Sequence, residues 1–222
     1  MARWAPLRRD VMASIVDEIL GNYRRGRIAI GVDGRTAAGK SRFADDLARE
    51  FERRGFATVR ASLDDFLNPA EQRYARGRNS AEGYYRDAYA YDVFRRVLIE
   101  PFRMGGSAAF VTAAFDKERD VALEPKWRTG PDDIFLIVDG GFLDRAELRG
   151  VWNYTIWLDA DDEVRAERLR QRDGIEPGSE RAERYEGAHE LYERDARPRE
   201  VAVAIVDNTD AEHPRRVFAD AC

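Results

Sequence analysis

Cysteine and histidine are scarce in this chain of 222 residues. The one cysteine, Cys222, is the last residue, and the two histidines are His189 and His213. A lone cysteine excludes an intrachain disulfide and a cysteine-based metal cluster, which fits a reducing compartment such as the cytoplasm. Because both histidines stand among charged residues without a ligand-like partner, we predict that both lie at the surface and bind no metal.

Long apolar runs and an excess of positive charge are also missing. No stretch approaches the roughly 20 apolar residues of a membrane span, and residues 1–6 lead into a charged segment instead of an apolar signal core. The formal net charge is −5, whereas nucleic-acid-binding domains are usually basic. We therefore expect a globular cytoplasmic protein without a membrane or nucleic-acid partner, and a small molecule as its ligand.

Lysine is the third scarce residue, and one of only three lysines stands inside a glycine-rich loop. Residues 34–41 match the pattern G-x-x-x-x-G-K-[ST] of phosphate-binding P-loops. In such loops backbone N–H groups and a helix N-terminus surround the phosphates, the lysine neutralises charge and the hydroxyl ligates Mg²⁺. The pattern predicts binding of a nucleoside triphosphate with magnesium, although a glycine turn can also merely join a strand to a helix. The predicted nucleotide-binding residues are Gly34, Arg35, Thr36, Ala37, Ala38, Gly39, Lys40, Ser41 and Arg42.

Apolar runs alternate with amphipathic segments along the chain. The expected strands are residues 27–32, 56–62, 133–138, 151–158 and 201–206. The expected helices are residues 6–21, 41–54, 90–104, 161–172 and 180–197, with a short helix at the end of the chain. This order predicts a three-layer α/β P-loop fold with a five-stranded parallel sheet. A short antiparallel hairpin is expected from 108–115 and 121–123.

We expect one domain over residues 1–222. It would contain an N-terminal helix within 1–26, an acceptor-side loop at 63–88 and a small mobile lid at 168–184. Aromatic residues at 127, 152 and 157, which are expected to be exposed, would suit an interface between copies of the chain.

Acidic residues follow two of the expected strands. Asp64 and Asp65 follow the second strand, and Asp139 follows the most apolar one. Since ligands of parallel sheets bind at the carboxyl ends of the strands, these side chains are expected beside the phosphates. Asp64, or less favourably Asp65, would then accept a proton from an acceptor hydroxyl, while Ser41 and Asp139 would hold Mg²⁺. The alternative is that the aspartates only cap turns.

An arginine-rich helix follows the fourth strand. Four arginines at 165–172 precede Asp173-Gly174, as in a lid that closes over a triphosphate. The alternative is a solvated helix with Glu–Arg pairs three or four residues apart. We select Arg168 as a phosphate contact and Arg172 as a catalytic residue beside Lys40 and Asp64.

Aromatic and acidic residues between 82 and 116 are candidates for the acceptor site. Tyrosines can stack on a base or sugar, and carboxylates can hold hydroxyl groups, although half of these tyrosines are equally suited to packing. The candidates are Asp64, Tyr84, Tyr85, Asp87, Phe115 and Asp116.

Taken together, these motifs resemble the uridine kinase family, which includes phosphoribulokinase, bacterial-type pantothenate kinase and nicotinamide riboside kinase. The resemblance covers about residues 27–210. Residues 63–69 resemble the segment whose first aspartate is the family's catalytic base, which implies that role for Asp64. Residues 87–92 and 115–116 resemble stretches on the acceptor side, and 168–173 resembles the lid.

The sequence also departs from the family pattern. Asp139 stands where the family has a magnesium-linked glutamate, and residues 117–120 lack the histidine that uridine kinases place against the base. The resemblance therefore implies transfer of the γ-phosphoryl group of ATP to a hydroxyl, while the acceptor stays open among a nucleoside, a vitamin precursor, a sugar phosphate and an antibiotic.

Other P-loop functions fit the sequence less well. A GTPase would need the Asn-Lys-x-Asp guanine selector, which is absent. A partner-coupled ATPase would be expected to carry a partner domain or a Leu-Ser-Gly-Gly-type signature, and neither is found. An inactive binding protein would not be expected to retain Lys40, Ser41, Asp64 and Asp139.

Overall fold

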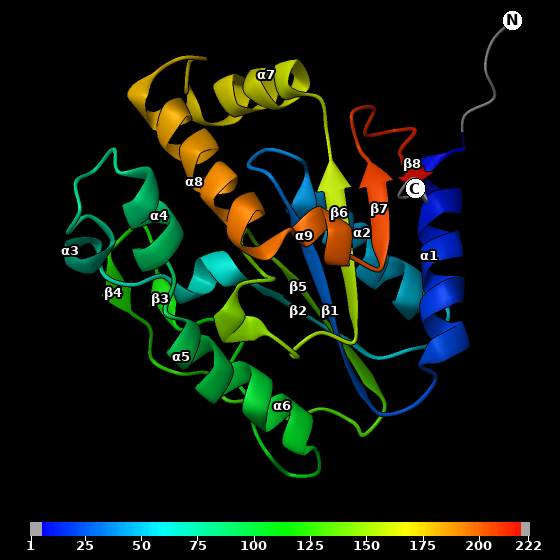
Figure 1. Cartoon of the computed structure of the whole chain (residues 1–222). Helices are drawn as coiled ribbons and strands as arrows, with labels where there is room; N and C mark the ends of the chain where they lie inside the picture. The colour runs from blue at the N-terminus through cyan, green and yellow to red at the C-terminus, as the bar shows by residue number, and fades with distance from the viewer. Residues whose placement is uncertain (1–5, 219–222) are drawn as a thin grey trace, which may run out of the picture.

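A six-stranded sheet runs through the centre of the computed structural model, which describes residues 6–218 (Figure 1). Its order is β2-β5-β1-β6-β7-β8, and the first five of these strands are parallel. The strands are β1 (Arg27–Gly34), β2 (Thr58–Ser62), β5 (Ile134–Asp139), β6 (Tyr154–Asp159), β7 (Ala204–Asp207) and β8 (Arg215–Val217).

The sheet has six strands, one more than the five predicted from the sequence. β8 pairs antiparallel with β7, where the sequence predicted a helix at the end of the chain. Arg215 and Arg216 obscure its strand character, because only Val217 of its three residues is apolar. Arg216 is placed by an ion pair with Glu18 of the N-terminal helix, a contact that local patterns do not reveal. Cys222 lies outside the described residues.

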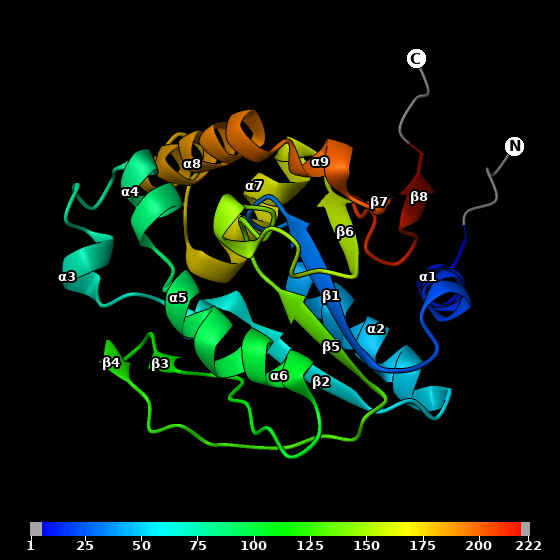
Figure 2. The ribbon, with the colours of Figure 1, turned by 60° about the horizontal axis from the view of Figure 1, so that its bottom comes forward.

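Helices cover both faces of the sheet, as predicted (Figures 1 and 2). One face packs on α1 (Arg8–Asn22) and α2 (Lys40–Arg53). The opposite face packs on the segment from α5 (Tyr91–Phe94) to α6 (Glu100–Met104) and on α8 (Glu180–Ala196). The alternation along β5 shows why: Phe135 and Ile137 join one apolar core, and Leu136 and Val138 join the other. A strand buried on both faces therefore has a continuous apolar sequence.

The predicted helix at 90–104 has an irregular centre. It consists of α5 (Tyr91–Phe94), a π-helical segment (Arg95–Ile99) and α6 (Glu100–Met104). Pro101 lacks an N–H and cannot donate the usual bond to the carbonyl four residues earlier, which accounts for the wider turn at this point.

The segment 63–88 is more ordered than the predicted loop. It contains a 3₁₀ turn (Leu63–Phe66), α3 (Ala70–Arg73) and α4 (Ala81–Asp87). The predicted hairpin exists between β3 (Phe115–Asp116) and β4 (Val121–Ala122), but residues 108–114 do not belong to its first strand.

The remaining helical elements lie in the connections that follow β5, β6 and α8. They are a 3₁₀ turn (Ala146–Leu148), α7 (Asp162–Asp173) and α9 (Pro198–Val201). α7 and α8 are joined by residues 174–179, so the predicted lid at 168–184 comprises the end of one helix, this connection and the start of the next. Other boundaries differ by up to three residues: β6 begins at 154, not 151, and β7 at 204, not 201.

The tryptophans do not form the predicted exposed set. Trp157 is 2% exposed within the core, and the Trp152 indole donates to the Leu143 carbonyl over 2.8 Å. Trp127 is 55% exposed. Among the described helices, none is long and apolar enough to cross a membrane.

Candidate active site

The glycine-rich loop connects the end of β1 to the start of α2, as predicted. Gly34 and Gly39 have φ values of 149° and 95°, and both are tightly enclosed. A Cβ atom on Gly34 would lie 2.5 Å from the Leu158 carbonyl oxygen, and one on Gly39 would lie 2.6 Å from Nδ2 of Asn208. Asn208 also donates to the Ala38 carbonyl over 2.7 Å. The loop is therefore shaped by contacts with the ends of β6 and β7 that exclude larger residues.

Lys40 extends along the inside of this loop. Its ammonium donates to the carbonyl oxygens of Gly34 and Arg35, each over 2.9 Å. Burial lowers the pKa of Lys40, while the carboxylates of Asp33, Asp64 and Asp139 act in the opposite direction. The ammonium is thus positioned among acidic groups at one edge of the sheet, where a phosphate could replace the carbonyl partners.

Ser41 and Asp139 meet at the same edge. The Ser41 hydroxyl donates to Oδ2 of Asp139 over 2.5 Å, and Arg60 donates to Oδ1 over 2.6 Å. Both Ser41 and Asp139 offer the oxygen ligands that Mg²⁺ prefers. No group of three histidine, cysteine or acidic side chains among residues 6–218 could hold a metal by itself. The pair therefore fits a magnesium ion that takes its other ligands from phosphates and water.

Arg60 was not selected from the sequence, and we expect it to keep Asp139 in place. The Asp139 side chain is 4% exposed, so removal of its cation partner leaves a buried carboxylate uncompensated. Arg60→Gln is expected to lower the free energy of unfolding by about 1–3 kcal/mol in urea denaturation. Asp45→Asn is the matched control, because it removes only the half-exposed partner of the same arginine. Equal destabilisation by both variants would contradict this role.

Asp64 is the second residue of the 3₁₀ turn that follows β2. Its backbone N–H donates to the Ser62 hydroxyl over 3.3 Å, and its Oδ1 accepts from the Tyr89 hydroxyl over 2.9 Å. Asp65, the alternative base, is directed elsewhere and lines neither of the cavities described next. Burial, followed by repulsion from Asp64, raises the pKa of Asp65. The geometry favours Asp64 of the two.

Two cavities meet at this edge of the sheet. The loop cavity has a volume of about 320 Å³ and is lined by Lys40 and Asp139, among others. The outer cavity has a volume of about 790 Å³ and extends between α3, α4 and α8. The residues that line both are Ser41, Asp64, Tyr84, Tyr89, Arg172 and Tyr185.

Comparison with solved structures bears on the fold alone. No family model and no curated protein matches the sequence. Among solved structures, a protein from Bacillus stearothermophilus described as a possible uridine kinase has a TM-score of 0.71 at 21% identity, covering 89% of this chain and 97% of that one. The D-glycerate 3-kinase from Cryptococcus neoformans has a TM-score of 0.61 at 13% identity, covering 94% and 99%.

A third structure, a proposed fructose transport system kinase from a Silicibacter species, has a TM-score of 0.65 at 23% identity. It covers 86% of this chain and 94% of its own. The chain shares the α/β fold of these three structures. The fold implied by the motif resemblance is thereby confirmed.

Within this fold, the predicted cations differ in their placement. Arg172 lines both cavities, with its guanidinium paired to Asp173 over 2.7 Å. Arg168 instead donates to the carbonyl oxygens of Asn208 and Thr209, each over 2.9 Å, and lines neither cavity. Arg172 is therefore better placed than Arg168 to contact a phosphate.

The arginines at either end of the loop pair with carboxylates. Arg35 contacts Glu193 over 2.6 Å and Glu186 over 2.9 Å, and Arg42 contacts Glu212 over 2.7 Å. Their side chains are thus engaged by the protein, and Arg35 lines neither cavity.

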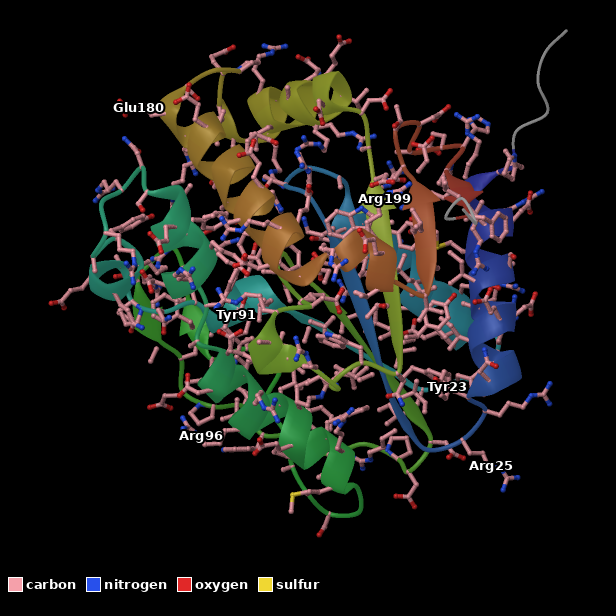
Figure 3. The ribbon with its side chains drawn as sticks, in the orientation of Figure 1. Tyr23, Arg25, Tyr91, Arg96, Glu180 and Arg199 are labelled. Carbon is pink, nitrogen blue, oxygen red and sulfur yellow. The ribbon has the colours of Figure 1, made fainter. Side chains whose placement is uncertain are left out.

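The predicted acceptor residues are only partly brought together. Besides Asp64, Tyr84 is the one that lines both cavities. Tyr85 packs instead in the core, where Arg145 lies 4.5 Å from its ring and 5.1 Å from that of Tyr91, which is labelled in Figure 3. Asp87 pairs with Arg76 over 2.8 Å.

The hairpin candidates also lie outside the cavities. Phe115 is 7% exposed, with the Arg73 guanidinium 5.9 Å from its ring. Asp116 accepts from the backbone N–H groups of Glu118 and Arg119 over 3.0 and 3.1 Å, which shapes the turn to β4. In this structure, the two residues therefore support the hairpin.

His189 contradicts the prediction of a surface residue. It is 1% exposed, and its Nε2 accepts from the backbone N–H of Thr36 over 2.9 Å. Burial, with Lys40 and Arg35 nearby, lowers its pKa well below the usual value, so the ring is neutral. Its helical spacing of three residues from Tyr192, which is also buried, was the signal available in the sequence.

Asp33, which precedes the loop, was likewise not selected. It is 2% exposed and accepts from the N–H groups of Gly34 and Leu143 over 2.7 and 3.0 Å and from the Tyr192 hydroxyl over 2.5 Å. Burial raises its pKa to about 6. The carboxylate ties the start of the loop to α8 and to the segment after β5.

Asp144 lies beside this group and provides a pH test. Burial, with repulsion from Asp33, raises the pKa of Asp144 to about 7, above the ordinary 3.8. The folded chain therefore binds more protons than the unfolded chain between these values, so its stability falls as the pH rises through this range. Asp144→Asn should raise the free energy of unfolding by about 1–2 kcal/mol at a pH near 8 and change it little near pH 4. Thermal unfolding at both pH values checks this; the same effect at both would count against it.

Proposed function

We propose that this chain transfers the γ-phosphoryl group of ATP to a hydroxyl group of a small molecule. The observation that carries the proposal is the position of Asp64, which lines both the loop cavity and the outer cavity. A nucleotide in the first and an acceptor in the second would meet at this carboxylate. A kinase needs a base at that point to accept the proton of the attacking hydroxyl.

The loop cavity has the groups that hold a triphosphate. The backbone N–H groups of the loop and the start of α2 favour negative charge, and Lys40 supplies a cation. Ser41 and Asp139 would hold Mg²⁺, which when bound neutralises charge that develops on the phosphates.

The groups around Asp64 support its role. Tyr89 donates to one carboxylate oxygen and so fixes its orientation, which leaves the other oxygen for the acceptor hydroxyl. Arg172 lines both cavities and could stabilise charge on the transferred group.

The outer cavity also bears on the alternative of a partner-coupled ATPase. An ATPase needs room for water beside the phosphates, whereas this cavity is large enough for a metabolite and is continuous with the base. The structural neighbours are described as a possible uridine kinase, a proposed fructose transport system kinase and a D-glycerate 3-kinase, so the fold leaves the acceptor open.

An ADP-release assay with Mg·ATP tests the proposal. The acceptors would be uridine, cytidine, nicotinamide riboside, pantothenate, ribulose 5-phosphate, fructose and D-glycerate, with Lys40→Ala as the inactive control. We expect ADP release that depends on an added acceptor. Release at the same rate without an acceptor would instead indicate an ATPase.

A further inference from the structure

The outer cavity is lined by an unusual number of cations. Six positively charged side chains face it from α3, α7, α8 and the connections between elements, against the two carboxylates of Asp64 and Asp173. The cations are Arg73, Arg78, Lys117, Arg172, Arg181 and Arg184. This concentration stands in a chain whose formal net charge is −5.

Most of this charge has no partner in the protein. Arg73 pairs with Asp120 over 2.6 Å and Arg172 pairs with Asp173. Among the described residues 6–218, no carboxylate lies within ion-pair distance of the other four cations, which are Arg78, Lys117, Arg181 and Arg184. Exposed cations need no partner, because water solvates them, so the decisive case is the buried one.

Arg184 is the buried member of this set. It is 9% exposed, and its guanidinium carbon lies 4.7 Å from the ring centre of Tyr84 and 5.3 Å from that of Tyr74. Its Nε is fully buried and has no hydrogen-bond partner in the part of the chain that the structure describes. Two aromatic faces offset only part of the cost of removing a guanidinium from water. A group that supplies negative charge is therefore missing from its surroundings.

The missing charge is better supplied by the acceptor than by the nucleotide. Of the six cations, Arg172 is the one that also lines the loop cavity; Arg73, Arg78, Lys117, Arg181 and Arg184 line the outer cavity alone. Tyr84, which packs on Arg184, lines both cavities together with Asp64. An anion beside Arg184 can thus belong to a molecule that also reaches the base.

We propose that the acceptor is an anion, a hydroxylated small molecule whose carboxylate or phosphate group binds to Arg184, with Arg78, Arg181 and Lys117 around it. This inference rests on the proposed function for the identity of the reacting hydroxyl. Guanidinium groups bind carboxylates and phosphates through paired, charge-assisted hydrogen bonds. A neutral nucleoside or sugar offers no partner for this charge, and Arg184 makes such acceptors poor ligands.

Matched pairs of ligands test the proposal by calorimetry. Protein saturated with Mg·ADP, which occupies the loop cavity, is titrated with D-glycerate and glycerol and with fructose 6-phosphate and fructose. The first pair tests a carboxylate and the second a phosphate. We expect at least one anion to bind about tenfold or more tightly than its neutral counterpart and to lose this advantage at high salt. Equal binding within both pairs overturns the proposal.

Variants of Arg184 test whether this residue causes the preference for anionic ligands. Arg184→Gln should reduce the anion preference about tenfold, and Arg184→Lys should retain part of it. Arg194→Gln is the matched control, because it removes an exposed arginine of the same helix that pairs with Asp195. Folding is checked by circular dichroism, and the salt dependence of the wild-type protein tests the proposal even where a variant fails to fold. An undiminished preference in folded Arg184→Gln rejects the assignment.

The outcome is separable from that of the ADP-release assay. Acceptor-dependent ADP release that is strongest with neutral molecules would leave the proposed function standing and overturn this inference. Preferential binding of an anion without any phosphoryl transfer would leave the anion-binding site standing and overturn the proposed function.

Discussion

Asp64→Asn is expected to reduce kcat by about 10²–10⁴-fold while leaving ATP affinity almost unchanged. The amide keeps the size of the side chain and its hydrogen bond from Tyr89, but it cannot accept the proton of an attacking hydroxyl. The loss should therefore appear in turnover. Acceptor titration in the ADP-release assay gives kcat and KM, and calorimetry with Mg·ATP gives the nucleotide affinity.

Asp65→Asn is the matched control for this experiment. Asp65 is the next residue in the same 3₁₀ turn but lines neither cavity, so its substitution should change kcat by less than about threefold. If the two variants lose activity equally, the role belongs to the turn as a whole. If Asp64→Asn retains wild-type turnover, Asp64 is not the base.

Lys40→Ala is expected to impair both nucleotide binding and catalysis. Loss of a charge-assisted contact with phosphate should weaken Mg·ATP binding by about 10–100-fold, and loss of the same charge in the transition state should lower kcat by a further 10²-fold or more. Calorimetry and the ADP-release assay measure the two effects separately.

Lys126, one of the other two lysines, provides the matched control for this variant. Lys126 is exposed and lines neither cavity, so Lys126→Ala should leave both quantities within about twofold of wild type. Unchanged ATP affinity in Lys40→Ala would show that the loop does not bind phosphate in the predicted way.

Most of the fold was predictable because its central strands are buried on both faces. Such strands are continuous apolar runs, as in residues 134–138, and they are bounded by the helices that the α/β pattern requires. β8 was missed because arginines make up two of its three residues. The helices in 63–88 were missed because they are short, and their ends depend on local caps such as the Ser80 hydroxyl, which accepts from the N–H of Gly83.

The candidate site could be predicted where its residues belong to a short, local sequence motif. The loop at 34–41 and Asp64 are examples, since a motif and a strand end locate them. Arg60, His189 and Arg184 depend instead on partners that lie elsewhere in the sequence, and the Thr36–His189 contact spans 153 positions. Arg168 is a different case, because its position in a lid-like helix suggested a phosphate contact, whereas in this structure its guanidinium donates to backbone carbonyls.

The enclosure of the loop by Asn208 has a consequence for the order in which the protein matures on the ribosome. Residues 34–41 are synthesised well before Asn208, whose side chain closes over Gly39 and Ala38. The strands on either side of β1 also follow the loop in the sequence. A nascent chain therefore carries the sequence of the loop long before it can hold the loop in this shape, and we expect it to gain affinity for ATP only after Asn208 has been synthesised.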